Sequence, residues 1–361
     1  MFSRCIPNVP AVFARRSVVA FLAGTLVWAA PLLAQTELGP VTVGAGLQTS
    51  YVHNKARAAD STDQLLVNSI RLYVNGPATN NIKFMFNTEY DGVNKIGVLD
   101  AVARIEMSPK FNIWAGRFLP PSDRANLYGP YYSQHWSVYT DGVQDGYPFV
   151  ATGRSNGVAY WGDFGKVKLS GGGFDGGSAT GNPNVIGAGR VQVDLWDPEP
   201  GYYLNGSYYG GKNLLAVGVA FQAQSAPTVT NKASSLDFLL ERKLPDGSVV
   251  SIESEFANYD RLGGYDSRYT SNKGGYVLGA YLFPKPVGPG KFQILGKYAK
   301  ARFGRALLPT DTNYNQKTTE VNFNYVIKEF NARVMSFYKN TKFTAVKTNF
   351  WQAGIGMQVQ M

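Results

Sequence analysis

Arginine and lysine residues recur in segments where apolar and polar residues alternate, and such cations could attract small anions. Arg117 and Arg124 flank the start of a long aromatic stretch. A guanidinium group is a planar fork of donors that can bind a phosphate or carboxylate through two hydrogen bonds. We expect these two arginines to lie at the narrowest part of an anion path. Further cations expected along this path are Arg71, Arg104, Lys166, Lys168, Arg190 and Arg333.

The aromatic stretch covers residues 119–151. It is longer than an ordinary surface connection and too rich in aromatic residues for a disordered segment. We therefore expect residues 119–151 to fold into a lumen as a constriction loop. The alternative is that the aromatic side chains only pack this loop against a wall, with Arg124 paired to Asp123 or to a wall carboxylate. The tyrosines expected to guide solutes are Tyr128, Tyr131 and Tyr132.

Catalytic chemistry is not expected from this sequence. Ser133 and Asp141 lie near His135, but their spacing matches no known arrangement of nucleophile, base and orienting acid. There is no His-Glu-x-x-His or Gly-Lys-Ser/Thr motif. The glycine-rich stretch 171–177 leads into another loop, whereas a dinucleotide phosphate site needs the start of a helix. His53 and His135 alone cannot build a structural zinc site. We expect no enzyme activity, cofactor or metal.

The residues along the path must be positioned by β-strands. Stretches of about ten residues with alternating apolar and polar side chains run from Val41 to Met361, a pattern typical of a transmembrane antiparallel β-barrel. Turns such as 75–77 and 245–247 alternate with longer polar connections. Two connections break the rhythm, because 197–211 is long and 91–96 is short. The sixteen predicted strands are 41–52, 64–75, 81–91, 97–107, 110–118, 153–161, 165–174, 187–196, 212–224, 234–244, 247–259, 274–284, 290–302, 317–327, 330–340 and 348–361.

Charged residues fall on one face of the predicted strands. Ile82, Phe84 and Phe86 alternate with residues that include Lys83 and Glu89. A charge facing lipid near the midplane would cost about 2–4 kcal/mol, so the charged face is expected to line a lumen. The acidic residues that share this face with the cations are Glu89, Glu106, Glu241, Glu253, Glu255 and Glu320. The aromatic residues expected in interfacial girdles are Tyr73, Trp161, Trp196, Tyr281, Phe283, Tyr325, Phe350 and Trp351.

The first residues resemble a secretory signal. Arg15 and Arg16 precede an apolar run from Val18 to Ala30, and the small Ala34 stands before a polar segment. We expect residues 1–34 to be a cleaved signal peptide and residues 35–361 to form the barrel. The only cysteine, Cys5, lies in this leader. Without the three leader arginines, 32 basic residues face 25 acidic ones, which favours anions modestly. The charges form no basic tract, so no nucleic-acid partner is expected.

Three short segments resemble the phosphate-selective porin O and P family. They are Asn80–Phe84, Ala115–Ser122 and the stretch from Tyr202 to Lys212, which carries Gly-Tyr-Tyr and Gly-Gly-Lys. The resemblance implies a sixteen-stranded trimeric outer-membrane porin with its third loop in the lumen and basic residues along the bore. The most specialised members pass phosphate along an arginine ladder and a lysine cluster. That ladder cannot be matched residue by residue here, so a general porin with a weak anion preference is the safer expectation.

The sequence as a whole thus predicts a porin in the outer membrane of a Gram-negative bacterium. Its expected partners are outer-membrane lipid, small anions or other hydrophilic solutes, and further copies of the chain in a homotrimer. The main alternative is a non-conducting barrel that serves as an adhesin or surface receptor. A barrel hydrolase is the second alternative.

Overall fold

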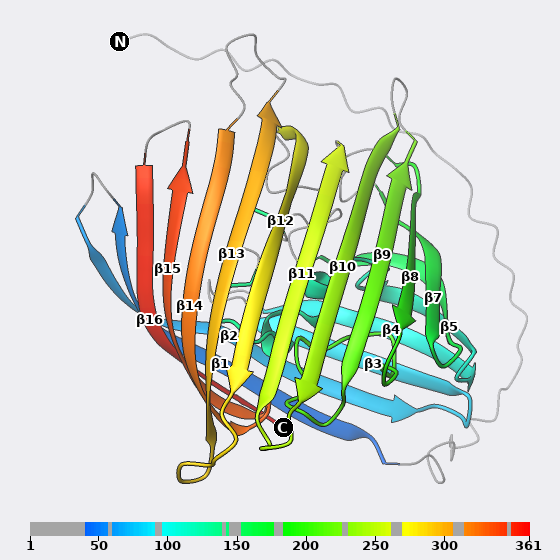
Figure 1. Cartoon of the computed structure of the whole chain (residues 1–361). Coiled ribbons are helices and arrows are strands. Elements are labelled where there is room, and N and C mark those ends of the chain that lie inside the picture. Colours follow the sequence, from blue (N-terminus) through cyan, green and yellow to red (C-terminus); the bar gives the residue numbers. More distant parts are fainter. Residues whose placement is uncertain are drawn as a thin grey trace, which may run out of the picture. The chain divides into compact units, whose positions relative to one another are not determined.

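The described part of the chain forms a closed barrel of sixteen antiparallel strands (Figure 1). This computed structural model describes residues 40–56, 60–90, 96–138, 142–143, 153–176, 183–225, 230–260, 269–305, 314–344 and 348–361. Each strand pairs with the next one in sequence, and the last strand pairs with the first. The expected signal peptide and part of the 119–151 loop lie outside the described residues. Within the described ranges, no helix is long and apolar enough to span a membrane.

The strands range from eight to sixteen residues in length. The first eight are β1 (Thr42–Ala56), β2 (Thr62–Pro77), β3 (Ile82–Tyr90), β4 (Ile96–Ser108), β5 (Phe111–Phe118), β6 (Ser155–Asp163), β7 (Val167–Phe174) and β8 (Ile186–Asp194). The second eight are β9 (Leu214–Gln224), β10 (Asn231–Lys243), β11 (Val249–Asp260), β12 (Tyr269–Leu282), β13 (Lys291–Arg305), β14 (Tyr314–Lys328), β15 (Ala332–Phe343) and β16 (Thr348–Gln360). Between β5 and β6 lie a short helix, α1 (Arg124–Tyr128), and a 3-10 turn, η1 (Pro130–Tyr132).

The predicted strand count of sixteen is confirmed, and every predicted strand overlaps an observed one. The two irregular connections are therefore real features and not miscounted strands. The β8–β9 connection covers residues 195–213, on the side of the barrel where the other described connections are short turns. We call residues 195–213 the inserted segment. The chain end lies on this same side, because the Gln360 amide donates to the Asn331 carbonyl in the β14–β15 turn.

Alternation along each strand separates an apolar outer face from a polar inner face. In β14, Val321 and Phe323 are 47% and 49% exposed, whereas Asn322 and Asn324 between them are buried. Successive side chains of a strand point to opposite sides of the sheet, so the exposed apolar set faces outward and the buried polar set faces inward. An inner face of polar residues is what a barrel in lipid requires if its interior holds water.

Three of the expected girdle aromatics lie on the inner face instead. Tyr73 follows the inward residues Ser69 and Arg71 at the same spacing in β2, and its hydroxyl is buried. Trp161 packs against the buried Trp114 of β5, with ring centroids 6.0 Å apart. Phe350, the third, also shares the inward phase of its strand, β16. Proximity to a strand end therefore does not place an aromatic residue in the girdle, because the phase of the strand decides which face it occupies.

Candidate functional site

Residues 119–138 follow β5 and contact side chains of the inner face. The Gln358 side chain donates to the Tyr131 carbonyl over 2.9 Å, and the Asn324 side chain donates to the Gln134 carbonyl over 2.9 Å. The backbone N–H of Trp136 donates to Asn322 Oδ1 over 3.1 Å. These partners belong to β14 and β16, so this part of the segment is bound to the wall far along the chain from its own strands.

The helix α1 is short and is fixed at both ends by local chemistry. Asp123 is its N-cap, and the Asp123 side chain accepts a hydrogen bond of 2.8 Å from the backbone N–H of Asn126. Gly129 ends the helix with a φ of 65°, a conformation that favours glycine. Burial raises the pKa of the Asp123 carboxyl to about 6, although the hydrogen bonds it accepts oppose this rise. The capped helix holds Arg124 and Tyr128 one turn apart.

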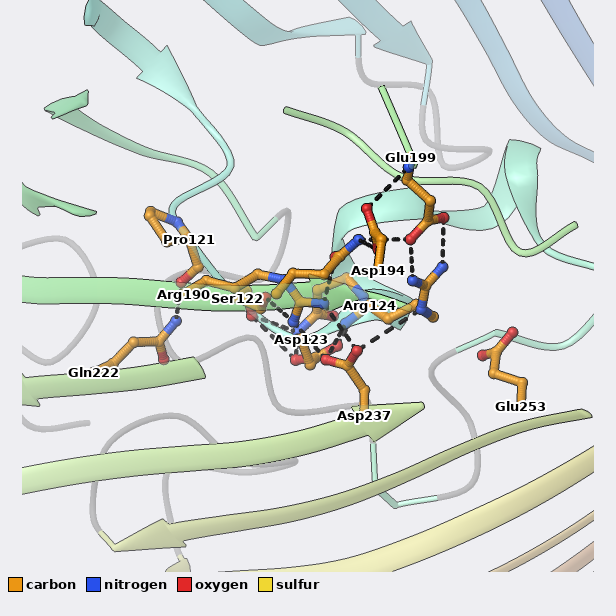
Figure 2. A network of polar contacts seen from close by, with 12 residues as sticks. Pro121, Ser122, Asp123, Arg124, Arg190, Asp194, Glu199, Gln222, Asp237 and Glu253 are labelled. Atoms are coloured by element: carbon orange, nitrogen blue, oxygen red, sulfur yellow. Dashed lines mark hydrogen bonds and ion pairs between the residues drawn. The ribbon is translucent and has the colours of Figure 1, made fainter. Parts of the chain in front are cut away.

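Arg124 is fully buried and lies at the centre of a charge network (Figure 2). Its guanidinium forms a two-pronged ion pair with Glu199, with 3.0 Å between Nη1 and Oε1. Its backbone N–H donates to Asp237 Oδ2 over 3.1 Å. The same carboxylate accepts two hydrogen bonds from Arg190, of 2.5 and 2.8 Å. The geometry favours the alternative interpretation in which Arg124 is paired, but its main partner, Glu199, belongs to the inserted segment. The wall carboxylate Asp237 is the more distant partner, 3.7 Å from Arg124 Nε.

The network ties the loop to the wall as well as to the inserted segment. Arg190 donates to the Ser122 carbonyl over 3.1 Å, so β8 also binds the start of the loop. Gln192 bridges Asp194 and Glu199. Burial disfavours the charged form of Glu199, but the adjacent Arg124 outweighs it and lowers the Glu199 pKa. Both guanidiniums of this network are paired with carboxylates, so neither offers a solute an uncompensated positive charge.

The inserted segment supplies residues that the sequence analysis did not assign to the site. The Tyr202 hydroxyl donates to the Leu119 carbonyl over 2.8 Å. The Gly206 N–H donates to the Tyr132 carbonyl over 2.8 Å, and the Gln134 side chain donates to the Gly206 carbonyl over 2.7 Å. Glu199 completes the set through Arg124. The available signal was the length of the connection, because a long segment where a hairpin turn is expected has to pack somewhere.

A cavity of about 550 Å³ runs between the loop, the inserted segment and the wall formed by β1–β4. Two arginines border it: Arg71 pairs with Glu89 at 2.9 Å, and Arg154 pairs with Asp100 at 3.2 Å. The Arg71 guanidinium also lies over the Tyr131 ring, 4.5 Å from its centroid. The neutral polar groups along the cavity are mostly amides and phenols, namely those of Tyr73, Asn75, Asn87, Asn126, Tyr128, Tyr132, Tyr203 and Asn205.

The predicted tyrosines lie close to one another, but each has a structural partner. The Tyr128 hydroxyl donates to Glu253 Oε1 over 2.8 Å, and the Tyr131 hydroxyl donates to Ser69 Oγ over 3.1 Å. Tyr132 packs edge-on against Phe330 and borders the cavity. Of the three, Tyr128 and Tyr132 contribute surface to the cavity, whereas Tyr131 is fully buried beneath Arg71.

The remaining predicted cations are dispersed. Arg104 borders a second cavity of about 530 Å³, with its Nε 3.7 Å from Glu106. Lys168 is buried and donates to the Glu199 carbonyl over 3.2 Å. Arg333 is buried and donates to the Tyr131 and Ser133 carbonyls, so it binds the loop and does not line the first cavity.

Two predicted cations do not reach the interior. Arg117 alternates with the inward residues Trp114 and Phe118 and so lies on the outer face, where its Nε donates to the Val98 carbonyl over 3.2 Å. Lys166 is exposed in the β6–β7 turn and donates to the carbonyls of the β8–β9 connection. Their expected place along the anion path is therefore wrong: the strand phase excludes Arg117, and the turn position excludes Lys166.

Ser133 and His135 do contact each other, with 2.9 Å between Ser133 Oγ and His135 Nδ1. The other ring nitrogen of His135 faces Lys297 Nζ at 3.1 Å, where a catalytic arrangement would need a carboxylate. Burial and the cations nearby, Lys297 first, lower the His135 pKa well below its usual value. Both side chains are buried, so this pair serves to fold the loop. Within the described residues, no group of three or more potential metal ligands is gathered.

No protein-family model matches the sequence, and no curated protein matches it. Solved structures do match. An anion-selective porin from Comamonas acidovorans is 14% identical, with a TM-score of 0.55 over 89% of this chain and 99% of that one. A Salmonella typhi OmpF complex with daunomycin is 11% identical, with a TM-score of 0.59 over 89% and 97%. The outer membrane channel DcaP of Acinetobacter baumannii is 12% identical, with a TM-score of 0.58 over 89% and 97%. At these identities the likeness establishes a shared barrel fold.

Proposed function

We propose that this chain is an outer-membrane porin through which small hydrophilic solutes diffuse passively. The observation that carries the proposal is the cavity of about 550 Å³ beside the loop, whose lining includes amides, phenols and the paired charges of Arg71 and Arg154. Such a lining supports hydrated solutes without binding them tightly, because its groups exchange hydrogen bonds with passing water. The similarity of the barrel to an anion-selective porin, OmpF and DcaP agrees with this proposal.

We propose only a modest preference for anions. Arg71 and Arg154 border the passage, and each has a carboxylate partner within 3.2 Å. A guanidinium paired with a carboxylate presents little net field, and salt screens that field over about 8 Å at physiological ionic strength. A phosphate-specific channel would need a run of cations without nearby acids. The anion preference is therefore expected to come from the overall basic balance and from these two arginines.

The proposal includes export and assembly. Residues 1–34 would direct the chain to the outer membrane of a Gram-negative bacterium and be removed during export. The barrel, residues 35–361, would place its short turns and both chain ends toward the periplasm, as bacterial barrels do. A homotrimer is proposed because one of the solved structures with a similar fold is described as a trimer form. Solute passage would require neither a cofactor nor an enzymatic step.

A liposome-swelling assay tests this function with neutral sugars of increasing size. Liposomes that contain the purified barrel should swell rapidly in small sugars, and the rate should fall steeply with sugar mass because residues 119–138 and the inserted segment narrow the interior. Heat-denatured protein in the same lipid is the control. Swelling no faster than that control would exclude the porin function and favour a surface receptor or adhesin.

A further inference from the structure

Five cations gather on the outer face of four neighbouring strands, β12–β15. They lie near the strand ends that are distant from the short turns. All five are exposed and lie outside the proposed constriction. We call this set the outer basic patch. Its members are Lys273, Lys300, Arg302, Lys317 and Lys342.

The strand register places like charges directly opposite one another. Lys300 pairs with Lys317 across β13 and β14, and Lys317 pairs with Lys342 across β14 and β15. One step along, Lys273 pairs with Arg302 across β12 and β13. Like charges at directly opposed positions destabilise a sheet. Among the residues that the structure describes, no carboxylate forms an ion pair with any of these five side chains, so the described residues do not offset this repulsion.

The patch lies at one edge of the apolar outer surface. Below the patch on the same face, Tyr298 is the next outward residue after Lys300. Val321 and Tyr338 lie two outward positions from the lysines of their strands, beyond Thr319 and Asn340. Tyr298, Val321 and Tyr338 are each 47% exposed. In β14 the outward residues from Thr319 to Ile327 span about 20 Å along the barrel axis, assuming an ordinary strand rise and tilt. An apolar band of a transmembrane barrel is about 25 Å tall, so Lys317 lies at the level of lipid head groups. The long connections on this side mark it as the outer leaflet.

We infer that the outer basic patch binds the phosphate groups of an anionic lipid of the outer leaflet. The occupant is a lipid and not free phosphate, because the apolar outer surface begins one to two outward positions below the cations and can hold acyl chains. The row from Lys300 to Lys342 crosses two strand spacings, about 10 Å. That separation suits a head group with two phosphates, each of which would relieve one lysine–lysine repulsion. The inference rests on the proposed outer-membrane location, and it adds a lipid site to the porin.

The test compares the binding of two lipids to the full-length mature barrel in detergent by native mass spectrometry. The probes are bisphosphorylated lipid A and the same lipid after enzymatic dephosphorylation. The variant is the triple change Lys300→Gln, Lys317→Gln and Lys342→Gln. The matched control removes two exposed lysines near the short turns, Lys285→Gln and Lys328→Gln. Each cation near a lipid surface contributes roughly five-fold in affinity, so the triple variant should bind at least about ten-fold more weakly.

The outcomes distinguish a phosphate-dependent lipid site from a site for free phosphate and from general adhesion of acyl chains. The inference predicts that the control binds the bisphosphorylated lipid like the unmodified barrel and that dephosphorylated lipid binds weakly to all three proteins. Equal binding by the triple variant, or equal binding of both lipids, would overturn it. Displacement of bound lipid by millimolar inorganic phosphate would show a free-phosphate site instead. Bilayer conductance of the same samples is measured in parallel: an unmodified barrel that conducts but binds no lipid disproves only the lipid site, whereas absent conductance disproves the proposed function.

Discussion

Asp237 is one of the wall acceptors that bind the loop, and we predict that Asp237→Asn destabilises the barrel by about 3–5 kcal/mol. Asp237 accepts two hydrogen bonds from Arg190 and one from the backbone of Arg124, all within 3.1 Å. Asparagine keeps the shape but removes the charge, so Arg190 is left buried without a carboxylate partner. Breaking a buried ion pair by removing one member typically costs about 3–5 kcal/mol.

The assay measures the free energy of unfolding in urea for the barrel in lipid vesicles, together with single-channel current. We expect the midpoint to fall and the open-channel current to become noisier, because the Arg124 backbone loses its charged acceptor and Arg190, which binds the Ser122 carbonyl, loses its carboxylate partner. The loop keeps its anchors on β14 and β16. The matched control is Asp246→Asn on the same hairpin, since Asp246 is exposed and accepts hydrogen bonds from Ser248, two positions further along the same turn. The control should leave the unfolding free energy nearly unchanged.

A double variant sharpens this test. Asp237→Asn combined with Arg190→Gln removes both members of the buried pair, so it should be less destabilised than the sum of the two single variants. Strict additivity would mean that the two side chains are not coupled. An Asp237→Asn barrel within about 1 kcal/mol of the unmodified protein would refute the view that this network fixes the loop.

Three further predictions concern the same interior. Gly218→Ala should cost about 1–3 kcal/mol in urea unfolding, because the new methyl group would overlap the Arg190 guanidinium, which its hydrogen bonds hold in place. Burial raises the pKa of Asp123 to about 6, so the folded barrel binds more protons than the unfolded chain between about pH 4 and 6. The free energy of unfolding should therefore fall by up to about 3 kcal/mol as the pH rises through this window. The Asp123→Asn variant should lack this fall. Replacing both Arg71 and Arg154 with Gln should shift the reversal potential in a salt gradient toward cation preference.

Each of these three predictions has a control and a contrary result. For Gly218 the control is Gly279→Ala, where an added methyl meets no atom within 4 Å, and equal losses in both variants would contradict the overlap. For Asp123, the same pH dependence of the unfolding free energy in the unmodified barrel and in Asp123→Asn would contradict burial of a protonated carboxyl. For the arginine pair the control is Arg117→Gln, because Arg117 lies on the outer face. A change of ion selectivity in this control, without one in the double variant, would show that Arg117 borders the ion path and that Arg71 and Arg154 do not.

Alternation was sufficient to predict the strands, because each strand of a barrel in lipid must separate its two faces. Residues such as Asn322 and Asn324 could be assigned inward from their apolar neighbours alone. The same reasoning, carried from Trp114 and Phe118 through β5, places Arg117 outward, so its assignment to the constriction overlooked the phase of its own strand. Local periodicity thus determined the elements and most of the inner face.

The partner of Arg124 could not be identified from the sequence. Glu199 lies 75 positions away in the inserted segment, and their contact depends on how two irregular segments pack inside the barrel. Periodicity carries no information about such segments, because their backbones are not fixed by a ladder of hydrogen bonds. For the same reason the sequence could not show that Arg333 binds loop carbonyls, although its inward direction was predictable.

The most direct test of the porin account is the conductance and reversal potential of the purified barrel in a planar bilayer under a potassium chloride gradient, followed by titration with phosphate. The account predicts steady open channels with a small anion preference and little block by millimolar phosphate, since the arginines along the passage are paired. Strong block at low phosphate would contradict the general pore and indicate a specialised anion site. No conductance at all would contradict the porin function itself.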